Sequence, residues 1–241
     1  MSEFAALQAR LTGVRERIAR AADRAGRDPS SIRLVAVSKT FDADHVRAAA
    51  DAGQIDFGEN KVQEALQKMD RCADAALRWH LIGHLQSNKA RKAAGRFDAI
   101  HSLDTIELGD SLDQAAHAAN RSLDLLAQVD LAGEATKHGA REEQLLPIFE
   151  AASRWRRARL VGLMQLPPAA ADPDEARPYF KALVAVRDRL LARGVAPAML
   201  GELSMGMSHD FEVAVEEGAT LVRVGTAIFG SRGRAGADIR E

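Results

Sequence analysis

Lys39 closes the apolar run over 34–38 and is the first residue whose type and position suggest chemistry. Only seven of the 33 lysine and arginine residues are lysine, so the chain uses arginine wherever a fixed positive charge is enough. An amine can lose its proton, attack a carbonyl carbon and form an imine, whereas a guanidinium cannot. Lys39 is therefore a candidate Schiff-base lysine. The alternative is a lysine that reaches the rim of the fold and is ion-paired there.

An anion site is predicted later in the chain, around Ser208 and the apolar run over 221–229. Ser208 precedes a predicted helix over 209–218, so its hydroxyl and the first helical N–H groups could bind an anion together. Gly225 lets the backbone approach a ligand closely, and Thr226 adds a second hydroxyl. These groups are suited to a phosphate.

Arg223 lies inside the same run, between two valines. A buried guanidinium cannot shed its charge, so it needs a specific acceptor. The acceptor could be a ligand atom. Alternatively, Arg223 could be a structural arginine paired with Glu59 or Glu202.

Asn60 follows the apolar run over 55–57, after Gly58 and Glu59. It could contact the ring of a ligand, or it could cap the helix predicted to follow. The carboxylate of Glu59 could pair with Lys39 or with an arginine.

His80 lies in the apolar run over 79–83, and His84 follows four residues later, directly after the run. On a strand that spacing separates them by roughly 13 Å, which is too far for a shared metal ion. The sequence has neither an HEXXH motif nor clustered cysteines, so no metal site is predicted.

A Schiff-base lysine, a phosphate site and a buried arginine together match three groups of pyridoxal 5′-phosphate (PLP). These groups are its aldehyde, its phosphate and its ring nitrogen. PLP is therefore the predicted cofactor, with Lys39 on the aldehyde and Arg223 at the nitrogen.

Eight short apolar runs alternate with longer segments whose apolar residues recur every three or four positions. This alternation is typical of parallel strands joined by helices. It favours an α/β fold, a single (β/α)8 TIM barrel whose site lies at the carboxyl ends of the strands. An open doubly wound sheet is the alternative, but no glycine-rich fingerprint follows the first run. The runs cover residues 34–38, 55–57, 79–83, 99–103, 123–131, 160–166, 199–203 and 221–229.

An extra helix is predicted over 3–25, because Phe4, Leu7, Leu11 and Val14 recur at helical spacing. Gly26 is expected to end it. We expect this helix to pack on the outside of the barrel; a coiled-coil dimer seam is the alternative.

The whole chain, 1–241, is expected to form one domain. The proline-rich segment over 167–173 is a candidate lid over the mouth of the barrel, and the polar tail over 233–241 is expected to be frayed.

The composition excludes several classes of protein. The formal net charge is −1 over 241 residues, which argues against a nucleic-acid binder driven by charge. Apolar runs are too short for a membrane span, and no secretory signal is recognisable at the N-terminus. Cys72 is the only cysteine, so no internal disulfide can form. We therefore expect a cytoplasmic monomer.

Several stretches resemble the pyridoxal-phosphate homeostasis protein family. They are LVAVSKT, DFGENKVQE, WHLIGHLQSNK, LVGLM and LSMGMSHDFEVAVEEGATLVRVGTAIFG, and they span residues 34–230 in order. The resemblance implies a barrel like the N-terminal domain of alanine racemase. It assigns PLP to Lys39 and a role in the PLP site to the asparagine of FGEN, Asn60.

The same resemblance implies phosphate contacts from Met207, Ser208, Gly225 and Thr226, and it places Arg223 at the ring nitrogen. Two residues depart from the family pattern. His84 stands where proline or a small residue is expected, and Gln165 is also atypical.

A carrier is the favoured function. An arginine is a permanent donor, so a ring nitrogen facing Arg223 stays unprotonated and withdraws electrons only weakly. The resemblance accordingly implies a PLP carrier or reservoir in PLP and amino-acid homeostasis, which would pass the cofactor transiently to apo-enzymes. A weak PLP-dependent racemase and a non-PLP class I aldolase are the alternatives.

Tyr179 is expected to be a packing residue, and Lys137 is either a second PLP site or solvated.

Overall fold

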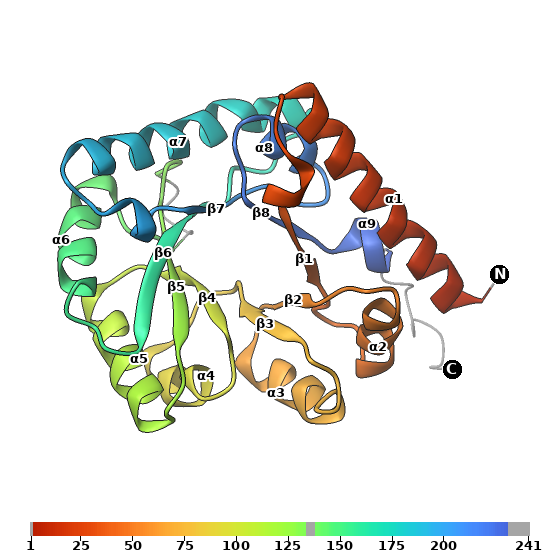
Figure 1. Ribbon diagram of the computed structural model, residues 1–241, viewed down its shortest axis with the longest axis horizontal. Helices are drawn as coiled ribbons and strands as arrows, with labels where there is room; N and C mark the ends of the chain where they lie inside the picture. The colour runs from red at the N-terminus through yellow and green to blue at the C-terminus, as the bar shows by residue number, and fades with distance from the viewer. Residues whose placement is uncertain (1, 134–137, 231–241) are drawn as a thin grey trace, which may run out of the picture.

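The computed structural model describes residues 2–133 and 138–230. Eight parallel strands pair in chain order, and the last closes the ring against the first. The fold is therefore the predicted (β/α)8 barrel, and the open doubly wound sheet is wrong (Figure 1). The strands are β1 (Arg33–Val37), β2 (Asp56–Glu59), β3 (Arg78–Leu81), β4 (Ala99–Leu103), β5 (Leu123–Gln128), β6 (Ala158–Met164), β7 (Glu202–Ser204) and β8 (Leu221–Val224).

The helices of the described residues lie outside this ring, as Figure 1 shows. They are α1 (Glu3–Arg24), α2 (Ala43–Asp51), α3 (Val62–Arg71), α4 (Ala90–Ala94), α5 (Ile106–Ala118), α6 (Glu142–Ala152), α7 (Arg177–Ala192), α8 (Phe211–Glu216) and α9 (Thr226–Phe229). Short 3-10 turns add η1 (Pro29–Ser31), η2 (Ser87–Lys89), η3 (Pro173–Ala176) and η4 (Pro197–Met199). Within the described chain, no helix is long and apolar enough to cross a bilayer.

Four of the strands, β3, β5, β7 and β8, are shorter than their apolar runs, and in β7 and β8 part of the run is helical. The run over 221–229 ends as a strand at Val224, and Thr226–Phe229 form α9 after the chain turns at Gly225. The run over 199–203 starts in η4, where Pro197 sets the backbone angle of the first turn, and pairs only from Glu202. Apolar content alone does not distinguish a buried strand from a buried turn of helix.

Side chains along each strand alternate between the helix-facing side and the barrel interior. In β8, Val222 and Val224 join the large apolar core beneath the helices. Leu221 instead contacts a small cluster that contains Val35 of β1 and Leu126 of β5. Because β1 and β5 are not neighbours in the ring, this contact crosses the interior. Arg223 shares the face of Leu221 and therefore points inside the barrel.

Helix α1 occupies Glu3–Arg24, where the sequence predicted a helix over 3–25. Ser2 caps it by accepting the N–H of Ala5, and Gly26 follows with a φ of +64°. Its apolar stripe, which includes Leu7 and Leu11, is buried against α8, α9 and α2 (Figure 1). Each fully buried leucine contributes about 1.5–3 kcal/mol to stability. The stripe thus covers the barrel's own helices, as expected, and is not left free for a coiled coil.

Candidate functional site at the barrel mouth

One cavity of about 670 Å³ opens at the carboxyl ends of the strands. This size lies within the usual range for small-molecule and cofactor sites. The cavity is lined by every residue that the sequence proposed for the site: Lys39, Asn60, Met207, Ser208, Arg223, Gly225 and Thr226. They come from segments after β1, β2, β7 and β8 and from β8 itself, and closure of the barrel brings them together.

Lys39 lies two residues beyond the end of β1, and its side chain is exposed to the cavity. Lys39 forms no ion pair with any of the described residues, so the rim ion pair considered above is not seen in this part of the chain. The next residue, Thr40, has a φ of +70°, which is uncommon for a residue with a side chain. Such backbone outliers cluster at functional sites, where the surrounding structure holds them.

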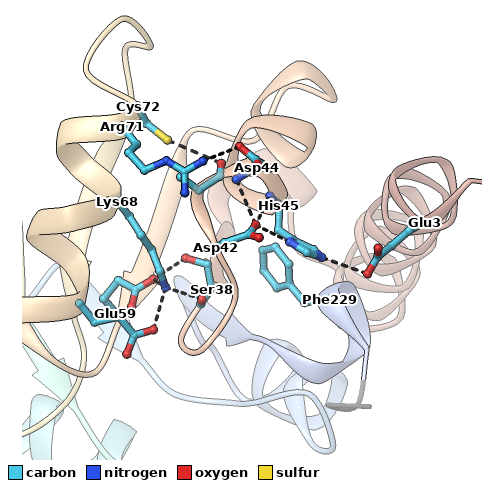
Figure 2. Close-up of polar contacts among 12 residues, drawn as sticks. Glu3, Ser38, Asp42, Asp44, His45, Glu59, Lys68, Arg71, Cys72 and Phe229 are labelled. Carbon is cyan, nitrogen blue, oxygen red and sulfur yellow. Dashed lines mark hydrogen bonds and ion pairs between the residues drawn. The ribbon is translucent and has the colours of Figure 1, made fainter. Parts of the chain in front are cut away.

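The residues around Lys39 are fixed by a buried lysine on α3. The Lys68 ammonium donates to the Ser38 carbonyl and to Glu59 Oε1, each at 2.7 Å, and to Glu64 Oε1 at 2.9 Å. The Ser38 hydroxyl donates to the same Glu59 oxygen at 2.6 Å. Figure 2 shows Lys68 reaching from its helix to Ser38 and Glu59. Glu59 therefore pairs with Lys68, and the expected pairing with Lys39 or an arginine is wrong.

Burial raises the pKa of Glu59, although the hydrogen bonds from Lys68 and Ser38 act in the opposite direction. Glu59 is fully buried, and its second oxygen, Oε2, has no hydrogen-bond partner among the described residues. This buried, half-satisfied carboxyl lies directly before Asn60 in the chain. Lys68 thus holds both Ser38, which precedes Lys39, and Glu59, which precedes Asn60.

Asn60 lines the cavity and does not cap the next helix, because Lys61 is the N-cap of α3. The backbone of Asn60 packs directly on Gly83, which follows β3. A Cβ atom at Gly83 would lie 2.3 Å from the Asn60 carbonyl oxygen. Only glycine therefore fits at position 83. This close contact fixes the distance between the Asn60 backbone and the segment that follows β3.

The Ser208 hydroxyl faces α9 and not the start of the following helix. Its oxygen accepts the N–H groups of Gly225 at 3.0 Å and Ala227 at 3.3 Å. Helix α8 begins only at Phe211, so the predicted helix over 209–218 is wrong at both ends. Ser208, Gly225 and Thr226 nevertheless form a small polar cup on one wall of the cavity.

Met207 also lines the cavity, but its backbone N–H is already used. It donates to Asp210 Oδ1 at 2.6 Å. Burial raises the pKa of Asp210, while the Met207 N–H lowers it. A phosphate contact from this N–H would require that hydrogen bond to break.

Arg223 is buried and bonds neither to Glu59 nor to Glu202. Its guanidinium donates to the Ser204 hydroxyl and, at 2.8 Å, to the Gln165 carbonyl. Glu202 is instead bonded to Arg33 and to the Thr220 hydroxyl. Burial lowers the pKa of Arg223 to about 10, so it stays charged at neutral pH. The structural ion pair considered above is therefore wrong.

Gln165, one of the two atypical residues, is fully buried beside Arg223. Its side-chain nitrogen has no hydrogen-bond partner among the described residues. Gln165 thus places an amide donor without a partner in the described part of the chain behind the cavity wall, next to Arg223.

Gln128 and His138 also line the cavity, and Asp104 lies beside His138, although no pattern in the sequence predicts these three residues. His84 stacks on His138 with ring centroids 3.6 Å apart and planes 9° from parallel. Ligand atoms of His84, Asp104 and His138 lie within 4.8 Å of one another. Lone pairs in two parallel planes do not converge on one ion, so this arrangement is a stacked pair beside a carboxylate. His84 belongs to this pair, whereas His80 is buried inside the barrel.

The segment over 167–173 passes over the same cavity. Pro167 and Ala169 line it, and the Ala171 carbonyl bonds His209 Nε2 at 3.0 Å. Closure of this segment as a lid stays a prediction. Lys137 and the tail over 233–241 lie outside the described residues.

Comparison with solved structures identifies two levels of similarity. PipY of Synechococcus elongatus PCC7942, solved with PLP bound, is 39% identical with a TM-score of 0.82, and the match covers 93% of this chain and 100% of PipY. The D-threonine aldolase of Filomicrobium marinum is only 16% identical, with a TM-score of 0.74 over 95% of this chain and 61% of its own. At that identity the aldolase shares the fold alone.

Comparison of sequences gives the family. The model of the alanine racemase N-terminal domain matches residues 10–233. The pyridoxal phosphate homeostasis protein of Aquifex aeolicus is 44% identical over 224 residues, which cover 92% of this chain and 97% of the relative. The pyridoxal phosphate homeostasis protein of Pseudomonas aeruginosa is 44% identical over 222 residues, which cover 92% of this chain and 94% of the relative. With the barrel and its mouth as described, the chain belongs to the pyridoxal phosphate homeostasis protein family, on the alanine racemase N-terminal-domain fold.

Proposed function

We propose that this protein binds PLP at the barrel mouth and acts as a PLP carrier or reservoir. The observation that carries the proposal is the convergence of three groups on one cavity: the Lys39 amine, which pairs with no acidic side chain of the described residues, a polar cup and a buried guanidinium. The similarity to PipY, a relative solved with PLP bound, supports it.

The residues at the mouth fit the three functional groups of PLP. Lys39 would attack the aldehyde carbon through its nitrogen lone pair, forming a C=N bond and releasing the carbonyl oxygen as water. The Ser208 and Thr226 hydroxyls would hold the phosphate. The N–H groups of Gly225 and Met207 would add contacts if they left their present acceptors, Ser208 Oγ and Asp210 Oδ1. Asn60 would lie against the ring, at the distance that Gly83 sets.

Arg223 is the residue that favours a carrier over an enzyme. Its guanidinium is charged at neutral pH and can only donate, so a ring nitrogen facing it stays unprotonated. Such a ring withdraws electrons weakly, which disfavours removal of an α-proton from an amino acid. Tyr179, the single tyrosine, lies on α7 and does not line the cavity. Transient transfer of PLP to apo-enzymes belongs to the same proposal.

An absorbance titration tests the binding site. We expect the wild type to give a visible imine band on addition of PLP, and Lys39→Ala to lose it. Lys61→Ala is the matched control, since Lys61 is an exposed lysine outside the cavity, and it should behave as the wild type. No band in the wild type would refute the PLP assignment and favour the aldolase reading of Lys39.

Isotope exchange separates a carrier from a racemase. The loaded protein would be incubated with amino acids in deuterated water, and deuterium at the α-carbon would be measured. A carrier gives no exchange above the rate of free PLP. Rapid exchange that depends on Lys39 would make the racemase the better description.

A further inference from the structure

Five buried side chains form an unbroken row of hydrogen bonds through the barrel. They come from five different strands: Arg223 of β8, Ser204 of β7, His101 of β4, His80 of β3 and Asp56 of β2. The Ser204 hydroxyl contacts Arg223 Nη1 and lies 2.9 Å from His101 Nδ1. His101 Nε2 lies 2.9 Å from His80 Nδ1, and His80 Nε2 lies 2.9 Å from Asp56 Oδ1.

The two ends of this row determine its direction. Arg223 can only donate, and an ionised Asp56 can only accept. All donors are satisfied if Ser204 donates to His101, His101 Nε2–H donates to His80, and His80 Nε2–H donates to Asp56. Both histidines are then neutral and protonated at Nε2. The reverse order would make His80 an imidazolium and leave the Ser204 hydrogen without an acceptor among the described residues.

We propose that Ser204, His101 and His80 form a one-directional hydrogen-bond relay that links Arg223 to Asp56 and positions the Arg223 guanidinium at the mouth. The consequence for the bound cofactor rests on the function proposed above. The relay itself concerns only the chain's own residues, so it can be tested without any ligand. In this scheme His80, His101 and Ser204 are positioning residues.

The charges around the relay agree with this direction. The two acceptors of Arg223, the Ser204 hydroxyl and the Gln165 carbonyl, are neutral, so the guanidinium has no directly bonded carboxylate among the described residues. Asp210 lies near enough to act on it electrostatically, and Asp56 is reached only through the relay. Burial would raise the pKa of Asp56, but hydrogen bonds from His80 and Arg78 outweigh it and keep the carboxyl ionised.

His101 occupies the middle of the relay and is fully buried. Burial lowers its pKa well below the ordinary value, and the nearby arginines Arg223 and Arg33 act in the same direction. His101 therefore stays neutral, as the proposed direction requires.

The far end of the relay lies away from the cofactor cavity. Asp56 is the first residue of β2. Together with Gln54 and Arg33 it lines a separate pocket at the amino ends of the strands. A change at Asp56 can thus affect the mouth only through the barrel interior. This separation makes Asp56 the decisive position for an experiment.

The first measurement is the tautomeric state of the histidines in the apo protein, from nitrogen-15 NMR of labelled histidine. We expect His80 and His101 both as the neutral Nε2–H form at neutral pH. An imidazolium at His80 together with an Nδ1–H form at His101 would mean the reverse direction and would overturn the proposal.

The second measurement compares Asp56→Asn with Asp98→Asn. Asp98 is a matched control because it also lies at the amino end of its strand and bonds an arginine, Arg121, but is outside the relay. We expect Asp56→Asn to change the His80 signal and to weaken PLP binding about threefold to tenfold. Asp98→Asn should stay within about twofold of the wild type. Equal effects of the two variants on PLP binding would overturn the relay.

If Asp56→Asn does not fold, Ser204→Ala breaks the relay at its other end. Ser204→Ala is expected to weaken PLP binding about tenfold, and Ser204→Thr to restore most of it. Wild-type affinity in Ser204→Ala would refute the positioning role. A wild type that binds no PLP would instead refute the proposed function, with the apo NMR result unaffected.

Discussion

Replacing Lys68 with methionine should leave a buried carboxylate without its cation. The Lys68 ammonium holds Glu59 and the Ser38 carbonyl at 2.7 Å, and the side chains of Lys68 and Glu59 are only 6% and 0% exposed. Methionine has a similar length but no charge. Because removing one partner of a buried ion pair typically costs 3–5 kcal/mol, we expect Lys68→Met to lower the free energy of unfolding by about that amount.

The cost should depend on pH. Burial raises the pKa of Glu59, and the hydrogen bond from Lys68 is the largest of the effects that lower it. In Lys68→Met the folded-state pKa should therefore rise further above the unfolded value. The folded protein then holds a proton that the unfolded chain releases, so the free energy of unfolding falls as pH rises. The destabilisation should be larger at about pH 8 than at about pH 5, because a carboxyl in the unfolded chain titrates near 4.3.

Guanidinium unfolding at both pH values, followed by the fluorescence of Trp79 and Trp155, measures this effect. Lys181→Met is the control, since the Lys181 side chain is 63% exposed and its ammonium lies 4.0 Å from Glu217. Adding Glu59→Gln to Lys68→Met should remove the extra pH dependence, because the amide cannot ionise. A loss below about 1 kcal/mol, or the same loss at both pH values, would refute the reasoning about the buried pair.

Three further substitutions test the site and the outer layer. Gly83→Ala should destabilise the protein by about 1–3 kcal/mol and weaken PLP binding, because its Cβ would lie 2.3 Å from the Asn60 carbonyl oxygen. Gly201→Ala, with no atom within 4 Å, is its control in the same denaturation and absorbance titrations. Gly13→Ala in α1 should raise the free energy of unfolding by about 0.5–1 kcal/mol, since its Cβ also meets nothing within 4 Å. Ser208→Ala should weaken PLP binding about tenfold, and an unchanged titration curve would argue against the phosphate cup.

Most of the fold could be predicted because strand–helix alternation is a local pattern. The eight apolar runs each contain or overlap a strand of the barrel, and the stripe around Leu7 and Leu11 is the buried face of α1. The boundaries were less predictable. Residues 226–229 are as apolar as β8, yet they form α9, because backbone pairing with a neighbouring strand ends at Val224.

The side-chain partners were the least predictable part of the site. Glu59 was assigned to Lys39 or an arginine, but Lys68 reaches it from α3. Ser208 was assigned to the start of α8, but it accepts N–H groups beside α9. One pattern in the sequence does point to the interior groups. Alternation along the strands places Asp56, His80, His101 and Arg223 on the interior face, where polar residues are costly unless bonded to one another.

By itself, the sequence determined the type and order of the chemical groups at the mouth of the barrel. Lys39, Asn60, Ser208 and Arg223 could be selected because their types are unusual at the ends or in the middle of apolar strands, and strand order is encoded locally. Only the tertiary structure decided which groups bond to one another. Hydrogen bonds of the interior join strands that are far apart in the chain, and their geometry depends on how the barrel closes.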